Sequence, residues 1–170
     1  FVQEHWLTSD ALYKFDGIMN EFSFSGKSSM DSKCNEGLLT GRPFGGVGVF
    51  WRKSLGNNLK LIGSDPDGRM IAVAIRNRGD ITICIGVYFP CDDHSRNYAA
   101  KLDSVLGYIT SVCDMYTGCK LMILGDFNFE CVDNRVGFRT FMAFAGKYDI
   151  ICCDELDKKN VGYTYYHESV

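Results

Sequence analysis

Four short apolar segments follow one another closely between residues 45 and 89, and they constrain the fold more than any other feature. They are "GGVGVFW" (45–51), "LKLIG" (59–63), "RMIAVAIR" (69–76) and "DITICIGVYF" (80–89). β-Branched residues alternate or run on in each segment, and the turn formers "DPDG" and "NRGD" separate the later ones, as is typical of β-strands. Because the connections are short, the pattern predicts antiparallel hairpins in a meander.

The chain before residue 45 contains weaker signals. "TSDALYKF" (8–15) predicts a short helix, with Thr8 or Ser9 as N-cap and an acidic residue in its first turn. "EFSFS" (21–25) alternates and predicts a half-buried strand, whereas residues 26–43 are rich in Ser, Gly, Asp and Asn and predict a long loop. The opening "FVQ" has the composition of the end of a strand whose start is absent.

After residue 95 the apolar period becomes helical. Apolar residues at spacings of 3, 4 and 7 predict an amphipathic helix over residues 96–116, capped by Ser95. "KLMILG" (120–125) then predicts a strand buried on both faces. A second helix is predicted over residues 135–146, followed by the strands "DIICC" (149–153) and "GYTYY" (162–166).

These elements predict an α/β fold in which two mixed β-sheets pack face to face with helices outside. At 170 residues and 46% hydrophobic composition, the chain is the size of one domain, residues 1–170, with a substantial core.

Charge and composition narrow the partners. A formal net charge of −3 means that any nucleic acid would have to be held by a local basic patch. No apolar run has the length of a membrane span, and "FVQEHWLTSD" lacks the features of a secretory signal, so we expect an intracellular protein, nuclear or cytoplasmic, without a membrane partner. The eight scattered cysteines are interpreted as reduced thiols, with Cys152 and Cys153 as small core residues.

Polar residues stand where predicted strands end. Asp126 and Asn128 follow "LMILG", Glu4 follows the apolar pair at the N-terminus, and Tyr88 comes just before Pro90. In a strand-like exit, residues 126 and 128 would project to the same side. Each residue also has an ordinary interpretation: Asp and Asn form turns, Glu4 could be a solvated loop residue, and Tyr88 could pack on a loop.

The order "QEHW", a Gly-Gly strand entry, "VYFP" and "ILGDFN" resembles the endonuclease/exonuclease/phosphatase superfamily. Within it, "QEHWL", "GRPFGGVGVFWRKSL" and "VYFPCDD" are most similar to the apurinic-type endonuclease domain of non-LTR (LINE-like) retrotransposons. The resemblance covers nearly the whole chain, and the joint occurrence of the motifs is more specific than any one of them. It implies a four-layer αββα sandwich, here incomplete at both termini, and a Mg²⁺-dependent nuclease, with Mn²⁺ as an alternative ion.

The resemblance also implies roles for single residues. Glu4 matches the glutamate that binds the divalent ion, Asp126 the aspartate that orients or deprotonates the attacking water, and Asn128 the asparagine that steadies the phosphate. Tyr88 matches the tyrosine whose hydroxyl bonds that phosphate. Thr164, in "GYTYYHES", aligns with a segment near the site; it is also an ordinary strand residue.

Basic residues beside the predicted strands could contact a nucleic-acid backbone. Arg42, Arg52 and Lys53 lie around the strand at 45–51, and Arg42 is the substrate-binding candidate among them. Such residues are usually only solvated.

Some elements of the family pattern have no counterpart here. The Ser-Asp-His segment, the aspartate of an "SxID" strand and the asparagine of the first strand are not found in the sequence. We therefore expect a fragment with about half of the catalytic constellation and without full activity of its own.

Three functions remain open on the sequence. The first is a DNA endonuclease domain that nicks one strand to prime target-site reverse transcription, with a reverse transcriptase domain in the same polypeptide. The second is a phosphoinositide or sphingomyelin phosphatase or phosphodiesterase of the same superfamily. The third is a non-catalytic remnant that acts as a binding module.

Overall fold

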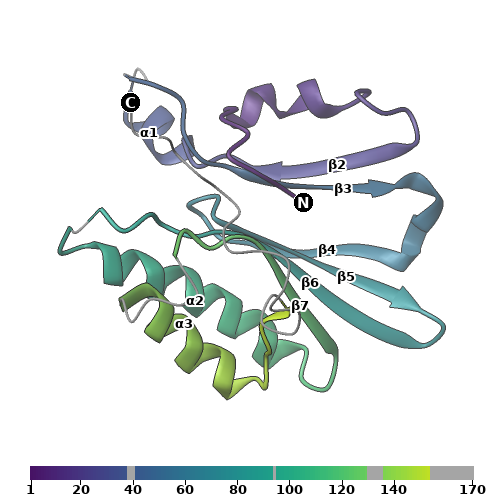
Figure 1. Cartoon of the computed structure of the whole chain (residues 1–170). Helices are drawn as coiled ribbons and strands as arrows, with labels where there is room; N and C mark the ends of the chain where they lie inside the picture. Colours follow the sequence, from purple (N-terminus) through teal and green to yellow (C-terminus); the bar gives the residue numbers. More distant parts are fainter. Residues whose placement is uncertain (38–40, 94, 130–135, 154–170) are drawn as a thin grey trace, which may run out of the picture. The chain divides into compact units, whose positions relative to one another are not determined.

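The computed structural model describes residues 1–37, 41–93, 95–129 and 136–153 of the chain (Figure 1). The chain divides into two compact units, residues 1–128 and 129–170. Both β-sheets belong to the first unit. The two units are described separately below.

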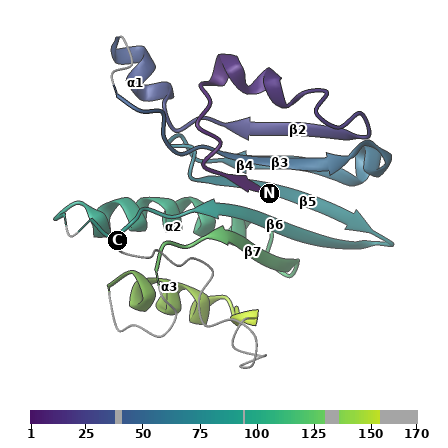
Figure 2. The same cartoon turned by 45° about the horizontal axis from the view of Figure 1, so that its top comes forward.

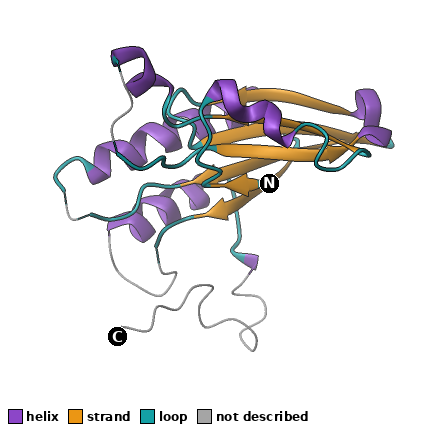
Figure 3. Cartoon of the chain, turned by 90° about the horizontal axis from the view of Figure 1, so that it is seen from above, coloured by secondary structure: helices purple, strands orange, loops and turns teal. Residues whose placement is uncertain are grey.

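The first sheet has three antiparallel strands in the order β1-β3-β2, which are β1 (Val2–Gln3), β3 (Val47–Arg52) and β2 (Phe22–Lys27). Phe24 and Phe50 are register partners on its outer face, where their ring centroids lie 4.7 Å apart. Phe15, at the end of the 3-10 helix η1 (Ser9–Phe15), packs on Phe24 with a centroid distance of 4.5 Å. This aromatic cluster holds η1 across the outside of the sheet (Figures 2 and 3).

The second sheet has four strands in the order β4-β5-β6-β7. β4 (Leu59–Ser64), β5 (Met70–Asn77) and β6 (Asp80–Tyr88) form an antiparallel meander, as predicted. The prediction that residues 45–51 belong to the same meander is wrong, because η2 (Lys53–Asn58) separates β3 from β4 and β3 pairs in the first sheet. β7 (Lys120–Asp126) pairs parallel to β6, because α2 (Tyr98–Met115) carries the chain back along the sheet. This sheet is therefore mixed, whereas the described strands of the first sheet are all antiparallel.

The two sheets pack face to face through small aliphatic side chains. The buried cluster between them consists of Val47, Val49, Ile71, Val73 and Cys84. Because side chains alternate along a strand, the next residues of β6 face the other way, and Ile83, Ile85 and Val87 are at most 1% exposed. The apolar face of α2, which includes Leu102, Val105 and Ile109, is buried on that side.

Residues 1–128 thus stack in the order η1, three-stranded sheet, four-stranded sheet, α2 (Figures 1 and 2). This arrangement confirms the predicted α/β class with two packed sheets and helices outside. The second unit contains α3 (Val136–Lys147), the helix predicted over 135–146, in which Phe144 and Ala145 are buried.

Several local predictions are corrected. Residues 26–43 are not one long loop: β2 continues to Lys27 and α1 (Asp31–Glu36) follows, where the Lys27 ammonium lies 3.0 Å from the Asp31 carboxylate. Ser95 does not cap α2, which begins after Asn97 without a side-chain cap; the Ser95 amide instead donates to Asp93. The apolar spacing predicted the helix correctly, but the hydrogen bonds of the turn before it determined where the helix begins.

Two predicted buried strands also differ. β7 is not buried on both faces, because it is the last strand of the sheet within the described residues and Met122 is 54% exposed. Residues 149–153 are not a strand: Asp149 has φ 53° and Ile151 is 68% exposed. Cys152 and Cys153 are half-buried and exposed, so they are not core residues. Residues 162–166 lie outside the described residues.

The described chain has neither a membrane-spanning helix nor a disulfide. No helix in it is long and apolar enough to span a membrane. Its seven cysteines carry free thiols, and Cys84 and Cys113 are buried.

Gly125 is a glycine that the sheet requires. Its φ is 140°, and a Cβ there would meet the carbonyl oxygen of Val87 on the neighbouring strand. We expect Gly125→Ala to lower the free energy of unfolding by about 2 kcal/mol or more. The strain of alanine at this positive φ and the clash of its Cβ with the Val87 carbonyl both contribute to this loss. Urea denaturation measures this change.

Gly107→Ala is the matched control. Gly107 lies in the exposed face of α2, with open space where a Cβ would be. This variant should be neutral or more stable by up to about 1 kcal/mol. Equal effects of the two substitutions would contradict the assignment of strain to Gly125.

Candidate active site

The parallel pairing of β6 and β7 brings two of the predicted residues together. Tyr88 ends β6 and Asp126 ends β7, and they are direct register partners. The Phe89 amide donates to the Asp126 carbonyl at 2.8 Å, which extends the ladder past the last pair. The carboxyl ends of two parallel strands meet at one edge of the sheet, so these side chains share that edge.

Asn128 joins this edge through a turn. Its amide N–H donates to Asp126 Oδ1 at 3.0 Å, and its side-chain Nδ2 donates to the Phe89 carbonyl at 2.9 Å. Asn128 has φ 52°, so the predicted strand-like exit is wrong, and the alternation of side chains ends with the strand. The Asp126 and Asn128 pair is held by an Asx-type turn, which leaves the second carboxylate oxygen of Asp126 outside this bond.

Glu4 reaches the same place from the other sheet. It follows β1 in the three-stranded sheet, and the Tyr88 hydroxyl donates to Glu4 Oε1 at 2.6 Å. Glu4 is exposed and has φ 52°, an uncommon conformation for a residue other than glycine. The structure therefore gathers Glu4, Tyr88, Asp126 and Asn128 at one junction between the two sheets.

The electrostatics of the junction keep Tyr88 protonated. Burial raises the pKa of Tyr88 well above its ordinary value of 10.0, and the hydrogen bond to Glu4 and the charges of Glu4 and Asp126 raise it further. The positive charge of Arg69 opposes this shift of the pKa. At neutral pH, Tyr88 is a hydrogen-bond donor that faces two carboxylates.

Arg69 is a member of this group that the sequence did not reveal. It lies just before β5, and its guanidinium carbon is 5.3 Å from the centroid of the Tyr88 ring. Its Nη1 donates to the Tyr88 carbonyl at 3.4 Å, and the Tyr88 amide donates to the Arg69 carbonyl at 2.8 Å. The usable signal was the turn "DPDG" directly before Arg69, since an antiparallel partner of the Tyr88 strand begins there.

The structure does not bring the other two predicted site residues, Arg42 and Thr164, into the junction as described. Arg42 is exposed and forms no hydrogen bond or ion pair with another described residue. Thr164 lies outside the described residues. A shallow cavity of about 420 Å³ is lined by Ser9, Asp10, Lys27, Asp31, Cys34 and Asn35, and includes none of the junction residues. In this cavity the Lys27 ammonium lies 3.0 Å from the Asp31 carboxylate, so these two charges pair with each other.

The donor set suits a hard cation. In the described part of the chain no group of three or more His, Cys, Asp or Glu side chains is placed to hold a metal. One or two carboxylates, with the remaining positions taken by water and substrate oxygens, is the arrangement that Mg²⁺ adopts in phosphate-processing sites. Glu4 and Asp126 are carboxylates of this kind. The described residues do not offer the three or four side-chain ligands that a zinc site needs.

His5 fixes the chain beside Glu4. Its Nε2 donates to the Lys27 carbonyl at 3.1 Å, and its Nδ1 accepts the Leu7 amide at 3.0 Å. The Trp6 amide donates to the Gly45 carbonyl at 3.0 Å. These bonds hold the turn in which Glu4 and Trp6 both have positive φ, so His5 has a structural role.

The fold and the junction define a two-sheet α/β protein with a carboxylate-rich edge. The chain matches no protein-family model and no curated protein. Among solved structures it is similar to the human Nocturnin catalytic domain with bound sulfate, at 14% identity and a TM-score of 0.49, over 77% of this chain and 53% of that one.

Two further structures show the same level of likeness. The endonuclease domain of TRAS1, a telomere-specific non-LTR retrotransposon, has 16% identity and a TM-score of 0.49, over 75% of this chain and 53% of that one. TDP2 of D. rerio, complexed with a single-strand DNA product, has 16% identity and a TM-score of 0.48, over 93% and 56%. The chain spans slightly more than half the length of these structures, and at such identities the likeness concerns the fold alone.

The half-buried position of His5 predicts a pH dependence of stability. Burial lowers the pKa of His5 below its ordinary value of 6.5, although its bonds to backbone groups oppose this. Because the unfolded chain binds the proton more readily, His5 contributes stability above about pH 6.5 that is lost as the pH falls below it. Urea denaturation at pH 7.5 and pH 5.5 should show this loss.

His5→Gln supplies the control, because glutamine can still donate to the Lys27 carbonyl but does not titrate. The variant should be less stable than the wild type at pH 7.5 and should lose less stability on acidification. A wild type and a variant with identical pH dependence would rule out His5 as the titrating group.

Proposed function

We propose that this chain carries a divalent-metal-dependent phosphodiester hydrolase site and that its substrate is DNA, which it nicks as the endonuclease domain of a non-LTR retrotransposon. The observation that carries the proposal is the junction itself: Glu4 comes from one sheet, and Tyr88, Asp126 and Asn128 come from the other. These four residues are the ones that the family resemblance selects from the sequence.

Each side chain has a chemical role consistent with its contacts. Asp126 has a carboxylate oxygen to orient an attacking water and accept its proton. Asn128 is fixed by its bond to Phe89, so its amide group can contact the phosphate or the water without reorganising. Tyr88 donates a hydrogen bond, and a non-bridging phosphate oxygen can replace Glu4 as its acceptor.

Glu4 is then available to hold Mg²⁺, or Mn²⁺, and Asp126, whose charge like that of Glu4 acts on Tyr88, is the second carboxylate of the junction. When bound, such an ion neutralises charge that develops on the phosphate. Arg69 supplies a second positive charge beside Tyr88, on the same edge of the sheet. A cation fixed by stacking is well suited to a phosphate, because it loses little rotamer freedom on binding.

The proposed partners follow from the substrate. A formal charge of −3 requires local contacts to DNA, and Arg69 is a better placed candidate than the exposed Arg42. Target-primed reverse transcription would require a reverse transcriptase, which we propose lies in the same polypeptide. A DNA target implies that the protein acts in the nucleus, or in the cytoplasm on the way there.

The first test is plasmid nicking by the polypeptide that contains this chain. With Mg²⁺, it should convert supercoiled plasmid to nicked circles, and Asp126→Ala should lower the rate by at least about 100-fold, because the group that orients the water is lost. Asp103→Ala, which removes an exposed carboxylate from α2, is the matched control and should nick normally.

The same preparation separates the alternatives. Release of phosphate from inositol phosphates, without action on DNA, would favour a phosphoinositide phosphatase, and cleavage of sphingomyelin a phosphodiesterase of that class. DNA binding without turnover would favour a non-catalytic module. Undiminished nicking by Asp126→Ala would refute the site.

A second prediction concerns Arg69. Arg69→Met should raise the KM for DNA and lower kcat/KM about tenfold or more, because a phosphate-facing charge is removed. Arg76→Met is the control at the other end of β5, where the side chain is exposed, and should leave kcat/KM within about twofold. Equal losses in the two variants would indicate a general effect of charge rather than a contact at the junction.

A further inference from the structure

We infer that Asp65, a buried carboxylate between β4 and β5, is a positioning residue that sets Arg69 against Tyr88. The structural part of this inference stands on the contacts of the turn at residues 65–70. Its consequence for catalysis rests on the proposed function. Nothing in the sequence motifs selects Asp65, which belongs to the turn "DPDG" and has the composition of an ordinary hairpin connection.

Asp65 is only 2% exposed, and its carboxylate collects the amides of its own turn. Oδ1 accepts the Arg69 amide at 2.7 Å and the Met70 amide at 2.6 Å, and Oδ2 accepts the Asp67 amide at 3.2 Å. The Asp65 amide also donates to the Met70 carbonyl at 3.2 Å. The Asp65 side chain thus fixes the amides of three residues of the turn, Asp67, Arg69 and Met70.

The turn is coupled directly to Tyr88. Arg69 and Tyr88 are joined by two bonds: from the Tyr88 amide to the Arg69 carbonyl at 2.8 Å, and from Arg69 Nη1 to the Tyr88 carbonyl at 3.4 Å. The guanidinium then lies over the Tyr88 ring at 5.3 Å. A displacement of the Arg69 backbone would therefore move both the cation and the residue that donates to Glu4.

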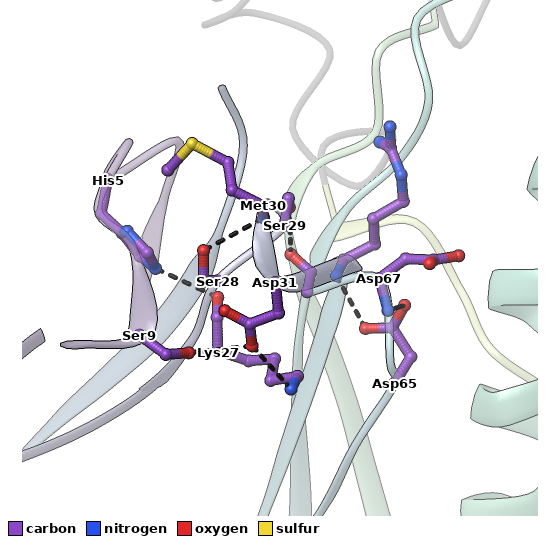
Figure 4. A network of polar contacts seen from close by, with 11 residues as sticks. His5, Ser9, Lys27, Ser28, Ser29, Met30, Asp31, Asp65 and Asp67 are labelled. Atoms are coloured by element: carbon purple, nitrogen blue, oxygen red, sulfur yellow. Dashed lines mark hydrogen bonds and ion pairs between the residues drawn. The ribbon is translucent and has the colours of Figure 1, made fainter. Parts of the chain in front are cut away.

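A second brace fixes the turn to the other sheet. The Ser29 hydroxyl donates to the Gly68 carbonyl at 3.1 Å and accepts the Gly46 amide at 2.7 Å, so one hydroxyl joins the chain after β2, the entry to β3 and the turn. Figure 4 shows Ser29 beside Asp65 and Asp67. Gly68 has φ 62°, and a Cβ there would lie 2.6 Å from the Ser28 carbonyl, so the turn abuts this segment.

Three amides converge on the Asp65 carboxylate, so the position requires a side-chain oxygen acceptor. Burial raises the pKa of Asp65, and the three amide donors oppose that shift. An apolar side chain would leave these donors without their acceptor in a buried place. An asparagine, in contrast, can direct its oxygen toward Arg69 and Met70 and lose only the bond to Asp67. Asp65→Asn is therefore the conservative variant, and Asp65→Ala is the disruptive one.

NMR of the full chain tests the positioning without any activity. Arg69 side-chain protons over an aromatic ring are shifted upfield, and Tyr88→Leu, which removes the ring, identifies this shift. We expect the upfield shift to persist in Asp65→Asn and to be lost in Asp65→Ala, while the methyl signals of Ile83, Ile85 and Leu102 keep their dispersion. An unchanged Arg69 shift in folded Asp65→Ala would overturn the inference.

If Asp65→Ala does not fold, Asp65→Ser decides in its place. The serine side chain is too short, and has too few oxygens, to accept from three amides. The upfield shift of the Arg69 protons should therefore be lost in Asp65→Ser and kept in Asp65→Asn. Retention of the shift in Asp65→Ser would equally overturn the inference.

Kinetics of plasmid nicking test the consequence. Asp65→Ala should lower kcat/KM about tenfold, mainly through KM, and should add less than about twofold in an Arg69→Met background, because it acts through Arg69. Additive losses would show that Asp65 acts independently of Arg69, against the inference. A wild type that does not nick DNA would remove the proposed function, while the Arg69 shifts would still decide whether Asp65 positions that residue.

Discussion

The contact between the two sheets is the interaction on which the rest of the structure depends. Val47 and Val49 of β3 pack against Ile71, Val73 and Cys84 of the four-stranded sheet, in a cluster that excludes water. Burying each such side chain contributes about 1.5–3 kcal/mol, which is enough to hold two sheets that share no backbone hydrogen bond in register. The end of β1 then lies against the end of β6, and Glu4 meets Tyr88 as a result.

Polar groups at the sheet junction are arranged around that apolar contact. The Tyr88 hydroxyl bridges to Glu4, and the Ser29 hydroxyl bridges the turn at 65–70 to the entry of β3. The Glu4 end of the first bond is exposed, whereas the bonds of Ser29 are partly buried. Within the described residues no buried side-chain nitrogen or oxygen lacks a partner. These bonds connect Tyr88 and the turn at 65–70 to the three-stranded sheet.

Backbone strain is concentrated at the same place. Glu4, Trp6 and Asn128 all have φ between 52° and 56°. Each is bonded to another segment: Glu4 accepts from the Tyr88 hydroxyl, the Trp6 amide donates to the Gly45 carbonyl, and the Asn128 side chain donates to the Phe89 carbonyl. Such conformations persist only when the surrounding structure determines them, and they are frequent at functional sites. The bonds of His5 near Glu4 and of Phe89 near Asn128 perform that role here.

Sequence periodicity alone determined most of the elements: β3 to β6, α2 and α3 are where alternation and helical spacing predict them, because each pattern records which face is buried. It did not determine their pairing, because only β4, β5 and β6 form the predicted meander and β3 belongs to the other sheet. It failed where local hydrogen bonds compete, as at α1, at the start of α2 and at residues 149–153. The motifs identified Glu4, Tyr88, Asp126 and Asn128 as candidates, but they did not show that these side chains contact one another. Only the tertiary structure decided that convergence and added Arg69 and Asp65, because a contact across two sheets leaves no periodic trace in the sequence of either strand.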